Sequence, residues 1–164
     1  MLDNVQKTRG HGCPVLMAMA MAICLVATNI RAEDGGVVEI QGSRVHLRND
    51  GPREWASFPK QPQADSLICQ FNSGANKTDW TISLRQQDVK QSWDVRLNDV
   101  SLGRLVRDEN DLWTDLKVPA GQIVDGENRL EIRCKANDAD DIRVGPISLH
   151  QVDPPALRSA ATIE

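Results

Sequence analysis

The pattern that decides the fold lies in residues 78–106, TDWTISLRQQDVKQSWDVRLNDVSLGRLV. Apolar and polar residues alternate there in three strand-length runs, 79–86, 92–98 and 100–106. Because successive side chains of a strand point to opposite faces, this alternation predicts strands with one buried face. The dipeptide Asn98-Asp99 separates the last two runs, and both residue types tolerate positive φ, so we expect a tight hairpin turn there.

The same alternation continues on both sides of this segment. The further runs are VVEI (37–40), SRVHL (43–47), SLICQF (66–71), LWTDLKV (112–118), NRLEIRCK (128–135) and IRVGPISL (142–149). Strands thus recur about every ten residues, which is the spacing of an all-β sandwich or barrel. Residues 118–128 are expected to form a turn of helix or a compact loop, and no long amphipathic helix is expected anywhere.

The first 32 residues have the order of an export signal. Lys7 and Arg9 precede the uncharged apolar run 15–27, and the small residue Ala32 stands just before Glu33. Positive, apolar, polar and small residues in this order predict a signal peptide over 1–32, cleaved after Ala32, and a secreted or periplasmic protein. A spanning helix needs about 20 apolar residues, so an uncleaved anchor is the weaker interpretation, and no stable membrane insertion is expected after cleavage.

The remaining chain is long enough for one domain. Residues 33–64 are interpreted as N-terminal strands and a linker, because 49–64 is rich in Pro, Gln and charge. Residues 65–151 form the predicted sandwich, which can also include strands from 36–48. Residues 152–164 are a tail.

Charge argues against a nucleic-acid partner. The chain has 19 Lys and Arg against 23 Asp and Glu, a net charge of −4. The predicted leader carries more basic than acidic residues, so the part that follows it is still more acidic. Neutralising phosphates needs a basic surface, and this composition does not supply one.

Two cysteines follow the leader, Cys69 and Cys134. Each alternates in phase with the apolar residues of its run, so both thiols are expected on the apolar side. An oxidising compartment would allow them to form a disulfide, and the alternative is two separate buried thiols that behave as small hydrophobic residues. Zinc is less well supported, because these cysteines and the histidines His46 and His150 lack paired ligand spacing.

The motifs of the second half resemble those of a known group of domains. Three patterns occur in order, a strand ending in V.LNG..LG.L, then VP.G.L..GEN.L.I, and finally DDI.VG.I.L. The matching residues are Val95, Leu97, Asn98, Leu102, Gly103 and Leu105, then Val118, Pro119, Gly121, Gly126, Glu127, Asn128, Leu130 and Ile132, and finally Asp140, Asp141, Ile142, Val144, Gly145, Ile147 and Leu149. The string over residues 66–150 resembles the carbohydrate-binding-module-like, galactose-binding-like jelly-roll domains at the front of large exported bacterial proteins of planctomycete type. Asp99 replaces the usual Gly of the first pattern.

This resemblance implies a jelly-roll β-sandwich of about eight to nine strands and a non-catalytic module that binds a carbohydrate or cell-surface ligand or acts as a spacer. Some similar domains precede metal-dependent hydrolases, so an N-terminal fragment of such an enzyme is one alternative, and a structural protein-interaction domain is another. No cofactor is expected. Galactose-binding-like domains often carry a structural Ca²⁺, for which the acidic runs 108–111 and 138–141 are the candidates, with solvated turn carboxylates as the plainer interpretation.

The tryptophans divide by their position in the alternation. Trp80 and Trp93 stand in phase with apolar residues, so they are expected in the core. Trp113 stands in phase with Asp115 and Lys117, so it is expected to be exposed. An exposed aromatic ring can cover the apolar face of a sugar, which makes Trp113 the leading candidate for a ligand-binding residue, with packing at an interface as the alternative.

Polar residues near the predicted strand ends supply the other candidates. Arg85 and Asp88 belong to the polar string 85–91, whose planar donors and acceptors could bind sugar hydroxyls, although such strings are commonly solvated loops. His46 and His150 lie outside any nucleophile or metal motif and are interpreted as strand-surface residues. No catalytic residue or metal ligand is assigned.

Overall fold

The computed structural model describes residues 23–24, 36–135 and 139–152. The strands are β1 (Ile23–Cys24), β2 (Val37–Gln41), β3 (Val45–Arg48), β4 (Ser66–Ser73), β5 (Trp80–Gln87), β6 (Trp93–Leu97), β7 (Val100–Arg104), β8 (Leu112–Val118), β9 (Gly126–Cys134) and β10 (Asp141–His150). These ranges contain no helix, and hence none long and apolar enough to cross a membrane. Apart from β1, the predicted signal peptide over 1–32 lies outside the described residues, as does the tail from 153 onward.

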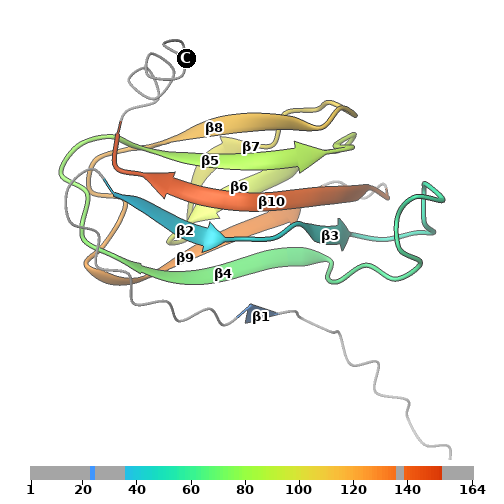
Figure 1. Cartoon of the computed structure of the whole chain (residues 1–164), viewed down its shortest axis with the longest axis horizontal. Helices are drawn as coiled ribbons and strands as arrows, with labels where there is room; N and C mark the ends of the chain where they lie inside the picture. Colours follow the sequence, from blue (N-terminus) through green and yellow to red (C-terminus); the bar gives the residue numbers. More distant parts are fainter. Residues whose placement is uncertain (1–22, 25–35, 136–138, 153–164) are drawn as a thin grey trace, which may run out of the picture.

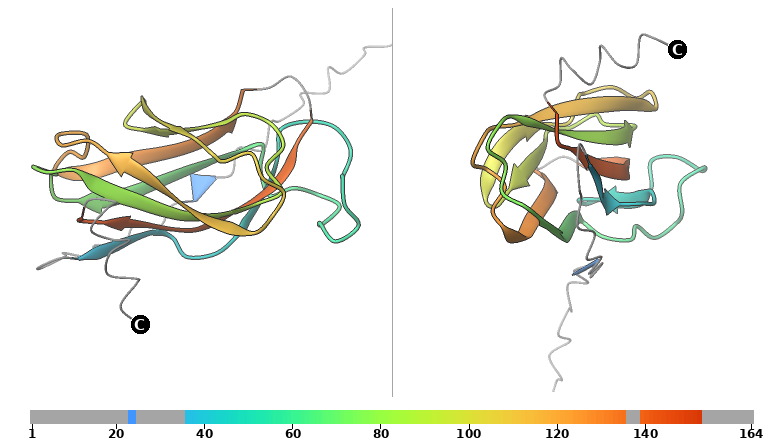
Figure 2. Two further views of the ribbon diagram at one scale, coloured as in Figure 1. Left: turned by 90° about the horizontal axis from the view of Figure 1, so that it is seen from above. Right: turned by 60° about the vertical axis from the view of Figure 1, so that its left-hand side comes forward.

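The strands form two facing sheets (Figure 1, with a second pair of views in Figure 2). One sheet has the order β1-β4-β9-β6-β7, and the other has the order β2-β10-β5-β8, with β3 beside β2 along the same edge of β10. Strands β2 to β10 pair antiparallel throughout, and β1 adds in parallel to β4. The predicted all-β sandwich is confirmed, and these nine strands agree with the expected eight to nine.

The core lies between the sheets and follows the sequence alternation. Fully buried apolar side chains come from both layers, among them Ile82, Leu84, Trp93, Val95, Leu97, Leu130, Ile132, Ile142, Val144, Ile147 and Leu149. Trp80 and Trp93 are both buried, as predicted. The phase of the alternation in β10 changes between Val144 and Ile147, where the pairing with β5 shifts register. Because of this bulge, the side chains of Ile142 and Val144 before it and of Ile147 and Leu149 after it all point into the core.

The expected hairpin turn between β6 and β7 is present. Asn98 and Asp99 both have positive φ, 47° and 63°, which is the conformation that a two-residue hairpin requires. Asp therefore replaces Gly at this position of the motif without preventing the turn, because Asp is one of the residue types that tolerate left-handed backbone.

Residues 49–64 do not form a linker. The segment folds back on one end of the sandwich, where Phe58 is buried and Arg48 N donates to Ala64 O at 3.0 Å. Both strands before it, β2 and β3, pair with β10 and belong to the sandwich. Composition favours a linker because the segment is rich in Pro and charge, whereas Glu54 binds two distant residues, Lys90 through its carboxylate and Asp141 through its N–H.

The structure does not place Cys69 and Cys134 within reach of a disulfide with each other. The two residues lie on neighbouring strands, but Cys69 is opposite Leu130, four residues before Cys134. An offset of four residues separates them by about 13 Å along the strands, whereas a disulfide needs Cα atoms within about 7 Å. Their predicted orientation is correct, because Cys69 is buried and Cys134 packs against the core.

Candidate functional site

Trp113 lies on the outer face of the β2-β10-β5-β8 sheet, on its edge strand β8. Its side chain is 55% exposed, whereas Val118 on the opposite face of the strand is fully buried. Directly across from Trp113 on β5 is Arg85. The structure therefore brings together two of the three residues that the sequence indicated as ligand-binding candidates.

A carboxylate holds the guanidinium of Arg85 in place beside Trp113. Asp111, just before β8, accepts from Arg85 Nε at 2.8 Å and from Arg85 Nη2 at 3.0 Å. Arg44 binds the same carboxylate through Nη2 and donates through Nη1 to Gln87 Oε1 at 3.1 Å. The hydrogen bond from Arg44, with a further one from Arg85, holds the pKa of Asp111 below its ordinary value against the opposing effect of burial.

This arrangement combines an apolar ring with oriented hydrogen-bond donors. Two guanidinium groups share one carboxylate, so the cluster of Arg44, Arg85 and Asp111 keeps one net positive charge. A planar ligand with an apolar face could stack on the Trp113 indole while its polar edge meets Arg85. The geometry suits binding of a sugar ring or a similar amphipathic group.

Asp88 is not part of this surface. It is only 5% exposed, with φ at 62° just past the end of β5. Its Oδ1 lies 2.9 Å from Lys90 Nζ, and Lys90 also pairs with Glu54. Burial lowers the pKa of the Lys90 ammonium, but the hydrogen bonds to Glu54 and Asp88 outweigh it and leave that pKa raised. The polar string suggested a solvated residue, whereas Asp88 is held inside by this ammonium.

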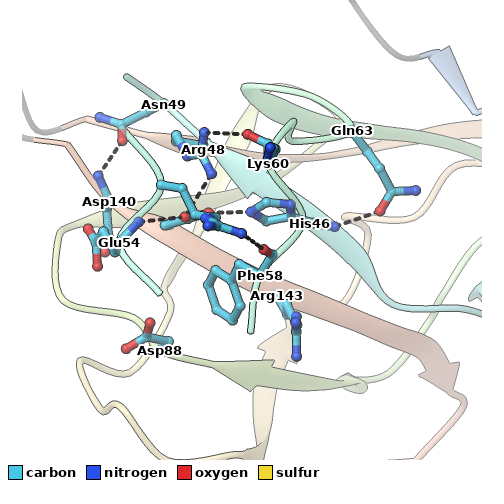
Figure 3. A network of polar contacts seen from close by, with 12 residues as sticks. His46, Arg48, Asn49, Glu54, Phe58, Lys60, Gln63, Asp88, Asp140 and Arg143 are labelled. Atoms are coloured by element: carbon cyan, nitrogen blue, oxygen red, sulfur yellow. Dashed lines mark hydrogen bonds and ion pairs between the residues drawn. The ribbon is translucent and has the colours of Figure 1, made fainter. Parts of the chain in front are cut away.

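A buried ionic network lies at the end of the sandwich that carries residues 49–64 (Figure 3). The Asp141 carboxylate, fully buried at the start of β10, contacts His46 Nε2 and accepts from Arg48 Nη2 at 2.9 Å and from Glu54 N at 3.2 Å. Burial raises the pKa of Asp141, but the hydrogen bonds from His46 and Arg48 outweigh it, so the net shift is downward. The prediction of a surface His46 is therefore wrong, because β3 lies against β10 and the ring packs edge-on against Phe58.

Asp140 anchors the turn between β5 and β6. Its Oδ2 accepts from Lys90 N at 3.2 Å, from Gln91 N at 2.9 Å and from Trp93 Nε1 at 2.8 Å. Its own N–H donates to Asn49 Oδ1 at 2.7 Å. Asp140 and Asp141 therefore hold two different loops at the start of β10, Asp140 the turn at 90–91 and Asp141 the segment at Glu54. Their role is structural.

The described residues of the acidic runs show no ligand set for the structural Ca²⁺ that the resemblance suggests. Calcium prefers six to eight oxygen ligands, several of them carboxylates without other cationic partners. Arginines already neutralise Asp111 and Asp141, and the nearest ammonium to Asp140 is Lys90 Nζ at 3.9 Å. Within the described ranges, no group of three or more His, Cys, Asp or Glu side chains is placed to hold a metal ion. Asp138 lies outside those ranges.

His150 lies near the end of β10 and is half-buried, next to Ser148, whose Oγ is 2.9 Å from His150 Nε2. Burial lowers the pKa of His150, and the charge of Asp115 only partly offsets this. β10 pairs with β2 on one side and β5 on the other, so its backbone N–H groups are used by the sheet.

Comparison with known proteins gives a similarity of fold only. No family model matches the sequence, and no curated protein matches it. A family 35 carbohydrate-binding module from an environmental isolate is 15% identical over 69% of this chain and 90% of its own, with a TM-score of 0.40. A GH26-CBM35 β-(1,4)-mannanase of Podospora anserina is 18% identical over 70% of this chain and 28% of its own, with a TM-score of 0.35. A CBM36 module in complex with calcium and xylotriose is 13% identical over 67% of this chain and 98% of its own, with a TM-score of 0.34. These solved structures to which the chain is similar are carbohydrate-binding modules, one of them joined to an enzyme.

Proposed function

We propose that this chain is an exported, non-catalytic module that binds a carbohydrate or a similar cell-surface ligand through Trp113 and Arg85. It would stand at the front of a larger exported bacterial protein, as the resemblance of its motifs implies. One observation carries the assignment of the surface, namely that an exposed indole stands directly across from a guanidinium held by a carboxylate.

The energetics favour a ligand at this position. Leaving a large aromatic ring in water forgoes about 2 kcal/mol of burial free energy. A ligand that covers the indole recovers part of that free energy. Because Asp111 already orients Arg85, a ligand loses little side-chain entropy when it accepts a hydrogen bond from the guanidinium.

The non-catalytic part of the proposal rests on the surroundings of two histidines, His46 and His150. His46 is bound to the buried carboxylate of Asp141, and the partner of His150 is Ser148 Oγ. Among the described residues, neither belongs to a group of three or more His, Cys, Asp or Glu side chains that could hold a metal ion for hydrolysis.

The test compares two exposed tryptophans. Trp113→Ala and Trp55→Ala remove rings of similar exposure, 55% and 49%, from different parts of the surface. Affinity electrophoresis through soluble galactan, mannan and xylan would measure binding, and thermal denaturation would measure stability. We expect at least one polysaccharide to retard the wild type, Trp113→Ala to weaken that binding about 10- to 100-fold with little change in melting temperature, and Trp55→Ala to retain it.

Two outcomes would count against the assignment. Unchanged binding by Trp113→Ala would remove the residue from the site. A large fall in melting temperature for that variant would show that the indole stabilises the fold and is not held ready for a ligand.

A further inference from the structure

A hollow of about 400 Å³ lies on the outer face of the other sheet, across β6 and β9. Its lining residues are Asp94, Arg96, Asp99, Glu131, Arg133, Cys134 and Lys135. We call it the β6–β9 hollow. It belongs to a different sheet from the Trp113 surface, so the two are separate features of the molecule.

Strand alternation explains why its lining is charged. Leu130 and Ile132 on β9 are fully buried between the sheets, so Glu131 and Arg133 stand on the outer face. Arg96 alternates in the same way with buried residues of β6, and it lies directly across from Glu131. Neighbouring charged side chains of both strands therefore share one surface.

The carboxylates of the hollow already have cationic partners. The ion pairs are Asp94 with Lys135 and with Arg104 at 3.4 Å, Glu131 with Arg129 at 2.8 Å, and Asp99 with Arg129 at 3.4 Å. These pairs satisfy all three carboxylates that line the hollow, and none of them involves Arg96 or Arg133.

Arg96 and Arg133 are left without a carboxylate partner among the described residues. The Arg96 Nη2 donates to the backbone oxygen of Asp99 at the hairpin turn, which orients the guanidinium without neutralising it. Arg133 is exposed. The lining itself has three cations and three carboxylates, and Arg96 and Arg133 are the two lining cations that no carboxylate binds in an ion pair.

We propose that the β6–β9 hollow is a second binding site, which takes an oxyanion, a carboxylate or a sulfate, carried by an acidic polysaccharide. A guanidinium presents parallel N–H donors that match such a group in two hydrogen bonds. Glu131 and Asp99 lie beside the guanidinium groups and can accept hydrogen bonds from hydroxyls. Donors for an anion next to acceptors for hydroxyls suit an acidic sugar, which carries both kinds of group, better than an isolated anion, which carries only one.

The test uses the full chain and removes both guanidinium charges. The double variant Arg96→Gln/Arg133→Gln is compared with Lys77→Gln/Arg107→Gln, a control that loses two exposed positive charges outside the hollow. The probes are polygalacturonate for a carboxylate, dextran sulfate for a sulfate, and dextran as the neutral polymer. Binding is measured at about 20 mM salt, where charge interactions are weakly screened.

We expect the wild type to bind at least one acidic polymer and not dextran, and the preferred polymer identifies the anionic group. Arg96→Gln/Arg133→Gln should weaken this binding at least about tenfold, whereas the control should stay within about twofold. The site would be ruled out if the wild type bound neither acidic polymer, if the double variant bound as well as the wild type, or if the control lost as much. Because the hollow and the Trp113 surface lie on different sheets, failure here leaves the proposal for Trp113 standing.

Discussion

Replacing Asp141 by Asn tests whether the buried ionic network holds residues 49–64 on the sandwich. The change keeps the size of the side chain and removes the charge that neutralises Arg48 and lies against His46, both less than 10% exposed. Breaking a buried ion pair by removing one partner costs about 3–5 kcal/mol of unfolding free energy. For a domain of this size, that corresponds to a fall in melting temperature of about 10–20 °C.

The assay is thermal and urea denaturation followed by circular dichroism at pH 7. Asp125→Asn is the matched control, because Asp125 is exposed on a loop, and we expect it to change stability by less than about 0.5 kcal/mol. The double variant Asp141→Asn/Arg48→Met should be less destabilised than the sum of the single variants, because Arg48 has already lost its carboxylate in Asp141→Asn.

The dependence of folding stability on pH in the acidic range supplies a second test of the role of Asp141. The folded-state pKa of Asp141 is lowered, so the unfolded chain binds the proton more readily. The stability contributed by this group is therefore fully present above its ordinary pKa near 3.8 and is lost as the pH falls through the lower folded-state pKa. The difference between wild type and Asp141→Asn should shrink below about pH 4. A variant within 1 kcal/mol of the wild type at pH 7, or a difference independent of pH, would refute this account.

Two further predictions follow from the fold and the leader. Gly145→Ala should lower the free energy of unfolding, measured by urea denaturation, by roughly 2–4 kcal/mol, because Gly145 has φ of 105° and an added Cβ would lie 2.4 Å from Ser43 O. The control Gly74→Ala should be nearly neutral, because an added Cβ at Gly74 meets nothing within 4 Å. N-terminal sequencing of protein recovered outside the cytoplasm should begin near Glu33, and material that still begins at Met1 would contradict export with cleavage.

Several features of the candidate sites could be predicted from single strands. The exposure of Trp113 follows from its phase with Asp115 and Lys117, just as the burial of Trp93 follows from its apolar phase. These predictions work because a strand turns successive residues to opposite faces, so one run of sequence is enough to assign the face.

Other features required strands to be placed side by side. His46 and Asp141 are 95 residues apart in the chain, and they meet because β3 pairs with β10. Nothing in either run shows that pairing, so the sequence alone predicts His46 at the surface and a linker over 49–64. Asp88 was misplaced for the same reason, since Lys90 and Glu54 hold it inside.

By itself, the sequence determined which segments form strands, the hairpin at Asn98-Asp99 and the faces of Trp80, Trp93 and Trp113, because these depend on local periodicity and on residues that tolerate positive φ. Only the tertiary structure decided register. Register separates Cys69 from Cys134, and it places Arg85 across from Trp113 and Arg96 across from Glu131. Partners in a sheet come from distant parts of the chain, and which strands pair, and in what register, depends on packing of the whole core.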